Sequence, residues 1–455
     1  CSPESTPAVI AIAPAVMLCC IASVIRGYHE GLSDVIPSAA AAVAEAVSRA
    51  AVGLAAAYGV VFWAKGRFER GADILGQYYA EYSEAYTAAL PLAAAGAIAA
   101  VSLSELCGLI SLLISDRKRK LPCSPGESTD STRTIACRLI REIIPVAASA
   151  LVMNCVSFVD LLTVTRTLRK TALAFPEILG NDPVLLAQCG GLDGLANFVY
   201  GSYTGIAMTV FMLIPSFAGM TEKTALPEVA AAWERKDVDS AAGHCCTLFR
   251  AAAAIGFPAC AGAAALAQTI LMTLYSRRAA EVSVCTGAFT ILCLGGFFMI
   301  TASAMFGIFQ AIGKAHIPLL LMTASVGIKA VLNPILMSVP QLNIAGAALA
   351  TAAGYIFIAI TGALLLRKHL SPCISVFRCV RKPLVGSLLC AGCAFLVCSL
   401  LPDSLGNLLR TVLSVVSGAF VYGISLIINS DFRGKRQLIK SRAFFSQKHL
   451  KNPQK

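Results

Sequence analysis

Six side chains that could take part in binding or transport chemistry lie within or beside long apolar stretches of this sequence. A charged group in the middle of such a stretch costs at least about 2.5 kcal/mol if the stretch crosses a bilayer. Charged groups at such positions are rare and commonly bind a substrate or an ion, so we treat these side chains as candidate functional residues. They are Arg26, Glu45, Arg49, Asp160, Lys329 and Asn333.

Glu45 and Arg49 are four residues apart, so on a helix they share one face and can neutralise each other. Either they form a structural ion pair, or Arg49 lines a cavity and binds a substrate phosphate, because a guanidinium can bind phosphate oxygens with two hydrogen bonds. Arg26 belongs to the segment IRGYHEG, residues 25–31, which predicts a turn between two apolar helices. It is a candidate for the inner mouth of such a cavity.

Asp160 lies late in its apolar stretch, and the next cation along the chain is Arg166. An isolated carboxylate in a transporter is a candidate for coupling to Na⁺ or H⁺. Lys329 and Asn333 are also four residues apart and share one helix face in a later stretch. Either they line a substrate cavity, or Lys329 is neutralised elsewhere in its own half of the protein.

The composition indicates the class of protein. Of the 455 residues, 57% are hydrophobic and 14% are charged, and the mean hydropathy is +0.74. A soluble domain is about a quarter charged, so we expect a polytopic membrane protein. Basic cytoplasmic loops explain the net charge of +12, so no nucleic-acid partner is expected. The cysteines lie mostly in apolar runs, and neither a metal-site spacing nor a phosphate-binding loop occurs, so we expect no cofactor and no enzyme activity.

Eleven stretches are long and apolar enough to cross a bilayer as helices, which takes about 20 residues each. They predict an all-α fold, with a basic, Pro- and Ser-containing linker between the third and fourth spans. The predicted spans are residues 7–25, 38–63, 88–114, 143–165, 200–222, 247–274, 284–309, 317–339, 344–366, 384–401 and 407–428.

Lys and Arg are concentrated in alternate loops and in the segment after residue 428. The positive-inside rule places these loops, including IRGYHEG, on the cytoplasmic side. We therefore expect a cytoplasmic C-terminus and an external first residue.

Residues 23–49 and 307–333 have the same order of features. In each, an apolar helix ends, a Gly-containing polar turn leads to a proline, and a new helix carries a charge. Both turns fall on the cytoplasmic side, as a parallel repeat requires. Four predicted spans lie between the linker and the second turn, but only one precedes the first. We therefore expect three further helices before residue 1, for 14 in all, and expect this chain to be an N-terminally truncated product or fragment.

Five stretches in the same order resemble the stage V sporulation protein B family of polysaccharide-type transporters. This family belongs to the multidrug/oligosaccharidyl-lipid/polysaccharide flippase superfamily. The matching stretches are IRGYHEG with Pro37, Glu45 and Arg49, and residues 143–160, 201–232, 307–318 and 342–357.

The resemblance implies a MATE-like fold, in which two lobes of six helices are followed by a C-terminal helix pair. It also implies how this chain divides. The regions are the remainder of the N-lobe (1–114, family helices 4–6), a basic cytoplasmic linker (115–142), the C-lobe (143–366, family helices 7–12), a loop with the C-terminal helix pair (367–428) and a basic cytoplasmic tail (429–455).

The resemblance further implies that the chain flips a lipid-linked saccharide precursor by alternating access. Such precursors are lipid II or another undecaprenyl-pyrophosphate-linked glycan of cell-wall, spore-cortex or polysaccharide biosynthesis. The expected location is the bacterial cell membrane, as a multi-pass monomer. The expected partners are a lipid-linked oligosaccharide and membrane lipids, with cell-wall synthases as further candidates.

In related lipid II flippases, an acidic residue on the helix that corresponds to that of Asp160 helps to bind sodium. Its partners lie on the helix that here carries Lys329 and Asn333. A lysine beside a sodium site would repel the ion. We therefore hypothesise that Lys329 takes the place of the ion and pairs with Asp160 in one conformation.

Two other functions stay open: a cation-coupled multidrug exporter of the same fold, and a non-transporting membrane scaffold or truncated remnant. Cationic drugs need acidic or aromatic cavities, so Arg49 and Lys329 favour an anionic lipid-linked substrate. A scaffold would need no buried charges.

Overall fold

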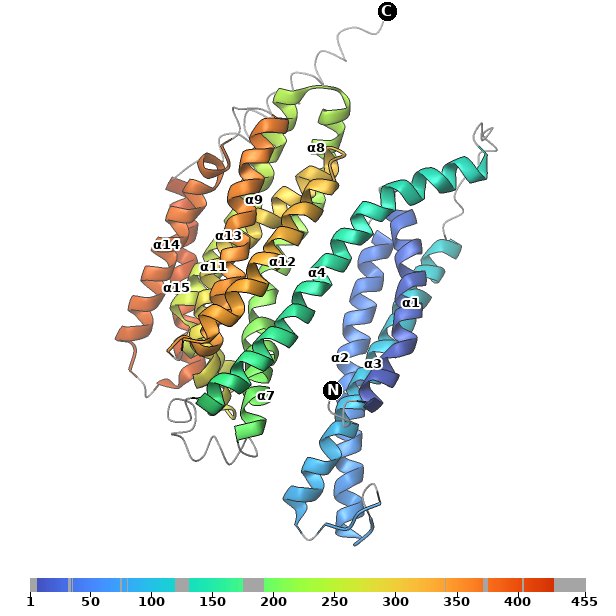
Figure 1. Ribbon diagram of the computed structural model, residues 1–455, viewed down its shortest axis with the longest axis vertical. Coiled ribbons are helices and arrows are strands. Elements are labelled where there is room, and N and C mark those ends of the chain that lie inside the picture. The colour runs from blue at the N-terminus through green and yellow to red at the C-terminus, as the bar shows by residue number, and fades with distance from the viewer. Residues whose placement is uncertain are drawn as a thin grey trace, which may run out of the picture. The chain divides into compact units, whose positions relative to one another are not determined.

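A computed structural model of the chain is mainly helical in the residues that it describes, and these contain no β-strand (Figure 1). The chain divides into two compact units, Cys1–Thr129 and Asp130–Lys455, and the boundary falls within the predicted linker. Residues 119–130 of that linker and the predicted tail 429–455 lie outside the described residues. The described residues are 6–31, 34, 36–73, 76–79, 81–118, 131–174, 192–339, 341–370, 375–402 and 405–428.

The first unit contains three long helices. They are α1 (Thr6–Gly31), α2 (Ile36–Glu69) and α3 (Tyr82–Lys118). Their alanine-rich apolar sequences favour helix, because Ala has the highest helix propensity. α3 packs against both α1 and α2. α2 and α3 approach closely where Gly53 faces Ala100 and Gly96 faces Ala56, since such small residues place almost no side chain between the two backbones.

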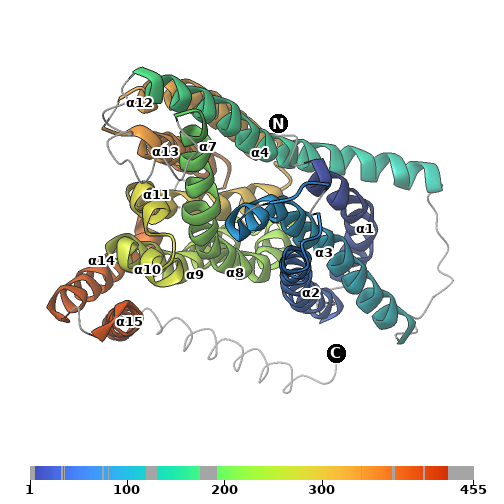
Figure 2. The same cartoon turned by 90° about the horizontal axis from the view of Figure 1, so that it is seen from below.

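The second unit contains the remaining helices. In chain order they are α4 (Thr132–Ala174), α7 (Leu192–Ser202), η2 (Tyr203–Met208), α8 (Thr209–Glu234), α9 (Val238–Ala265), α10 (Ala267–Leu274), α11 (Ala279–Ala311), α12 (His316–Met337), α13 (Asn343–His369), α14 (Val376–Leu400) and α15 (Asn407–Ile428). η2 is a π-helical turn that joins α7 to α8. α11 packs against α8, α9 and α13, and α4 lies alongside α12 (Figure 2).

Two clusters of buried apolar side chains form the core of the second unit, and α11 contributes to both. Phe309 of α11 belongs to one cluster and Phe289 to the other. Glycine lets α11 approach α9 closely, because a Cβ added at Gly296 would lie 2.6 Å from the Cys260 Sγ. The core therefore combines large aromatic side chains with points of close helix contact.

A disulfide joins α9 to α14 through Cys246 and Cys379, whose Cα atoms are 5.6 Å apart. These two residues depart from the expectation that the cysteines serve as small apolar side chains. Their separation of 133 residues produces no recognisable spacing in the sequence. Cys260 and Cys293, in contrast, are free and buried within the apolar core.

Each of the eleven predicted spans falls on helical segments of the structure, although 317–339 and 384–401 run past the ends of α12 and α14. The span 200–222 runs from α7 through η2 into α8. The span 247–274 crosses a break at Leu266, between α9 and α10. Ten helices among the described residues are long and apolar enough to cross a membrane. The remaining span, 143–165, lies in α4, several of whose side chains are not described. The chain is therefore an all-α polytopic membrane protein.

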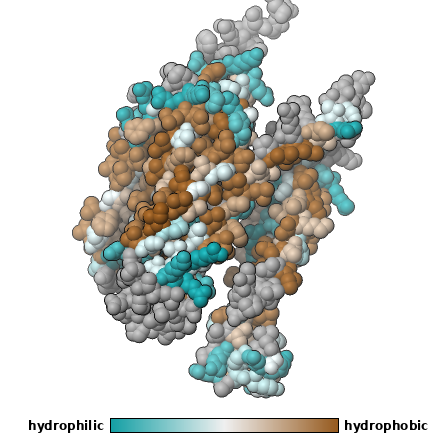
Figure 3. Space-filling model, in the orientation of Figure 1, coloured by the Kyte–Doolittle hydropathy of each residue, from teal (hydrophilic) through white to brown (hydrophobic). Residues whose placement is uncertain are grey.

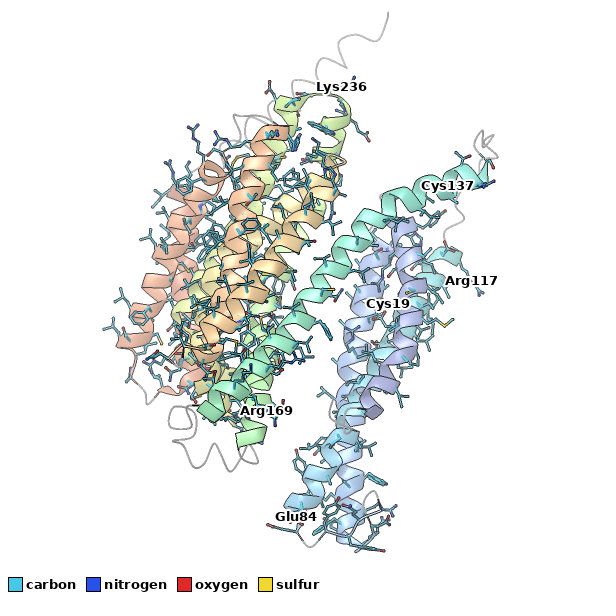
Figure 4. The ribbon with its side chains drawn as sticks, viewed as in Figure 1. Cys19, Glu84, Arg117, Cys137, Arg169 and Lys236 are labelled. Carbon is cyan, nitrogen blue, oxygen red and sulfur yellow. A yellow bond between two sulfur atoms is a disulfide. The ribbon has the colours of Figure 1, made fainter. Side chains whose placement is uncertain are left out.

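Polar residues gather at the ends of the second unit. Hydrophilic residues cover its upper end in Figure 3, and a broad apolar surface lies below them. Lys236 and Arg169, which the loop charges assign to opposite sides of the membrane, lie at opposite ends of this unit (Figure 4). The helix directions within the unit thus agree with the alternation used to predict sidedness.

Candidate functional site

Arg26 and Glu45 form an ion pair between α1 and α2 in the first unit, where Arg26 Nη2 donates to Glu45 Oε1. The carboxyl side chain of Glu45 is largely buried and lies against Gly108 of α3. A Cβ added at Gly108 would come within 2.5 Å of the Glu45 Cγ. Glycine at this position therefore leaves the space that the carboxylate occupies.

Arg49 binds α3. Its Nη2 lies 3.0 Å from Glu105 Oε1, and its Nε donates to Ser104 Oγ at 3.3 Å. Glu45 and Arg49 share a helix face, as their spacing predicts, but the expected ion pair between them is replaced by two pairs between helices. Arg26 of α1 and Glu105 of α3 face α2, and each needs a partner of opposite charge. Glu45 therefore pairs with Arg26, and Arg49 pairs with Glu105.

His29 lies near the same end of the first unit as Arg26, in the last turn of α1. Its side chain is 2% exposed, and its Nε2 lies 4.0 Å from Asp116 Oδ1 of α3. The described residues provide no hydrogen-bond partner for His29 Nε2, Arg26 Nε or the Ser38 hydroxyl, although all three atoms are buried. The segment IRGYHEG, predicted as a turn, instead forms the last turns of α1. Together with the start of α2 it brings several polar groups into the packed end of this unit.

Asp160 of α4 accepts hydrogen bonds from two side chains of α12. Lys329 Nζ lies 2.5 Å from Asp160 Oδ2, and Asn333 Nδ2 lies 2.9 Å from Asp160 Oδ1. Asn333 Nδ2 also donates to Thr163 Oγ1 at 3.1 Å. The spacing of four residues on α12 directs Lys329 and Asn333 at one carboxylate, because α4 packs alongside α12.

This network is withdrawn from solvent. Asp160 is 7% exposed, Lys329 4% and Asn333 0%. Two opposite charges can be retained in such a position when each is paired and hydrogen-bonded, whereas either one alone would be strongly unfavourable. Asp160 is isolated from cations in its own stretch of sequence, yet it is neutralised by a lysine 169 residues away.

Three buried polar atoms of the second unit have no hydrogen-bond partner among the described residues: the side-chain oxygens of Asn333 and Asn343, and the hydroxyl of Tyr203. Tyr203 is the first residue of η2 and is 2% exposed. Single π-helical turns inside longer helices occur frequently at functional sites. The sequence alone gave no signal for this turn, because its residues continue the apolar pattern of α7 and α8.

The six predicted residues thus form two networks, one in each unit. Arg26, Glu45 and Arg49 belong to the first, and the other three belong to the second. Their roles in substrate binding and ion coupling stay predictions. Ser104, Gly108 and Thr163 are uncharged, so the cost of a buried charge does not identify them. Glu105 is a charged residue inside a predicted span, and the sequence favours a packed helix group there rather than a site residue.

The fold and the two networks define a class: a polytopic helical membrane protein with paired charges buried between its helices. No family model matches the chain, and no curated protein matches its sequence. Among solved structures, the chain is similar in fold to the lipid II flippase MurJ in its inward closed conformation. The TM-score is 0.53 at 14% sequence identity, over 94% of this chain and 93% of that chain.

Proposed function

We propose that this chain is a membrane transporter that flips a lipid-linked saccharide precursor across the membrane by alternating access. The main support is the buried network of Asp160, Lys329 and Asn333, within a fold similar to that of a lipid II flippase. Ionised side chains inside membrane-spanning bundles are expensive and commonly serve transport or proton transfer. A non-transporting membrane scaffold would not need buried ionised side chains.

Arg49 is the best-placed residue to bind the pyrophosphate of such a substrate. Its side chain is 48% exposed, and the contacts with Ser104 and Glu105 hold its guanidinium in one orientation. The Nη1 edge takes no part in these contacts. Because a guanidinium presents donors on more than one edge, it can keep its structural contacts while it binds a phosphate oxygen. Arg26 and Glu45 would hold α1 against α2 beside this position.

Asp160 and Lys329 are the proposed coupling pair. The Lys329 ammonium already occupies the position next to Asp160 where a free cation would bind. The ion pair would therefore break when Asp160 is protonated or when α4 separates from α12. Transport would then not require sodium. Asn333 would hold the carboxylate in place in both cases, since it bonds the other oxygen.

The alternative is a cation-coupled multidrug exporter. Asp160 would then have to be an open acidic site for a cation, but its carboxylate is already paired with Lys329. In the first unit, Glu45 and Glu105 are likewise paired with arginines. The described residues therefore favour an anionic substrate over a cationic one.

The wider setting belongs to the same proposal. The precursor would be lipid II or another undecaprenyl-pyrophosphate-linked glycan of cell-wall, spore-cortex or polysaccharide synthesis. The protein would act as a monomer in the bacterial cell membrane, with its C-terminus in the cytoplasm and cell-wall synthases as partners.

The test is to express the chain in cells depleted of their own lipid II flippase and to measure growth and accumulated lipid II. Rescue by the chain, and loss of rescue in Arg49→Ala and Asp160→Asn variants at equal membrane levels, is the expected result. A parallel assay follows export of a cationic dye. No rescue with confirmed expression, together with dye export, would replace this proposal by the exporter.

A further inference from the structure

The end of the second unit that contains Lys236 carries a ring of cations with few acids. Successive helices run in opposite directions, so the α11–α12 turn, the end of α13 and the start of α14 all lie at this end (Figure 1). No Asp or Glu occurs between Glu281 and Asp403. The ring, which we call the basic rim, consists of Lys314, Arg367, Lys368, Arg378 and Arg381.

The segments that carry the basic rim share one packed apolar cluster. Ile312 and Ile317 from the α11–α12 turn, Leu370 after α13, and Val376 and Val380 from α14 belong to the same buried cluster. The three segments that carry these cations are therefore held together by packing.

The side chains of the rim point outward. Arg367, Lys368, Arg378 and Arg381 are exposed. Lys314 is half-buried, and its Nζ donates to His369 Nδ1 at 2.6 Å, which holds its ammonium at the end of α13. The positive charge of the rim is thus accessible from solvent or from the membrane surface.

Acids on the neighbouring α8–α9 turn are partly engaged elsewhere. Asp237 caps α9 by accepting from the Ser240 backbone N–H, and Glu228 lies 3.0 Å from His244. Two further acids lie here, Glu234 at the end of α8 and Asp239 in the first turn of α9. These carboxylates do not match the number of cations on the rim and on the α8–α9 turn itself, where Arg235 and Lys236 lie.

Exposed apolar side chains continue from the rim along two helices. On α13, Leu364 is 60% exposed and precedes Arg367 on the same helix face. On α14, Val385 is 51% exposed and follows Arg381 by four residues. Each arginine therefore ends an apolar stripe of a membrane-spanning helix. The arginine beside an apolar stripe matches a phospholipid, whose anionic phosphate lies next to its acyl chains.

We propose that the basic rim binds the headgroups of anionic phospholipids in the surrounding bilayer. Arg378 and Arg381 of α14 would contact the phosphate, and the apolar stripes of α13 and α14 would contact the acyl chains. The charge complementarity of an uncompensated cationic ring at the end of an apolar surface selects an anionic lipid over a zwitterionic one. This inference does not depend on the substrate that the chain transports.

The experiment places the purified protein in bilayers of phosphatidylcholine with a minor share of phosphatidylglycerol, and without any polyprenyl lipid. Lipid that stays with the protein after mild detergent extraction is quantified by mass spectrometry. The expected result is enrichment of phosphatidylglycerol, with about fivefold weaker binding for each arginine removed in Arg378→Gln and Arg381→Gln variants. Charge-preserving Arg378→Lys and Arg381→Lys variants should keep most of the enrichment.

The matched control is Arg277→Gln with Arg278→Gln, at the opposite end of the unit, where Arg278 lies 3.6 Å from Glu281. These changes should leave the enrichment unchanged. Equal retention of both lipids by the unaltered protein, or unchanged enrichment in the Arg378→Gln and Arg381→Gln variants, would overturn the proposal. Displacement of the lipid by inorganic phosphate would also overturn it, because it would assign a site for a free anion.

Discussion

Replacing Lys329 by methionine is expected to destabilise the second unit by about 3–5 kcal/mol, because the change leaves Asp160 buried without its cation. Methionine keeps much of the length of the lysine side chain, so little cavity forms. The exposed side-chain fractions are 5% for Lys329 and 11% for Asp160, so solvent screens this pair very little. The full cost of an unpaired buried charge therefore applies.

The double variant separates this electrostatic cost from a loss of packing. Asp160→Asn alone removes the carboxylate and leaves the ammonium buried against an amide. In Asp160→Asn with Lys329→Met, no charge remains, and replacing a buried ion pair by groups of similar volume is often close to neutral. We expect the double variant to be more stable than Lys329→Met alone, with a coupling free energy of at least about 2 kcal/mol.

The measurement is the free energy of unfolding in mixed micelles, with the second unit followed by cysteine accessibility. Arg277→Met, an exposed change on the loop before α11, is the control and should shift stability by less than about 0.5 kcal/mol. If the two single changes are additive in the double variant, Lys329 and Asp160 do not stabilise each other, and the reasoning is refuted.

Three further predictions test the two networks. Gly108→Ala should lower the free energy of unfolding by about 1–3 kcal/mol in thermal unfolding, since the added Cβ would displace the carboxylate of Glu45. The control is Gly59→Ala, where no atom lies within 4 Å of the added Cβ, and it should not lower stability. Equal effects of the two changes would contradict this prediction. Arg49→Lys should slow flipping of a pyrophosphate-linked lipid in vesicles by about tenfold because lysine lacks the planar fork; an unchanged rate removes Arg49 from the substrate site. Lys329→Ala should make transport depend on sodium, as the vacated carboxylate could then bind the ion, and equal rates in sodium and potassium would exclude this.

The sequence predicts the helices of this protein well, because about 20 apolar residues in a row leave few alternatives to a membrane-spanning helix. It also identifies Lys329 and Asn333 as one helix face, since a spacing of four residues has a fixed meaning on a helix. The pairing with Asp160 was accessible as a hypothesis only through the resemblance, which implies that the helices of Asp160 and Lys329 share an ion site.

The partners of Arg49 were less accessible. The spacing of Glu45 and Arg49 suggests a pair within one helix, but the rotation of α2 about its axis decides which neighbour each side chain meets. That rotation depends on how α1, α2 and α3 pack, including the contact of Glu45 with Gly108. The π-helical turn η2 and the disulfide were hidden for a similar reason, since neither changes the local pattern of apolar residues.

The disulfide between Cys246 and Cys379 turns part of the second unit into a covalent ring. The ring runs from α9 to the start of α14, so it can close only after all the helices between them have been synthesised. A single protease cut between residues 247 and 378 would leave one molecule on a non-reducing gel and two fragments on a reducing gel. The same ring means that α14 cannot leave α9 during transport while the bond is intact.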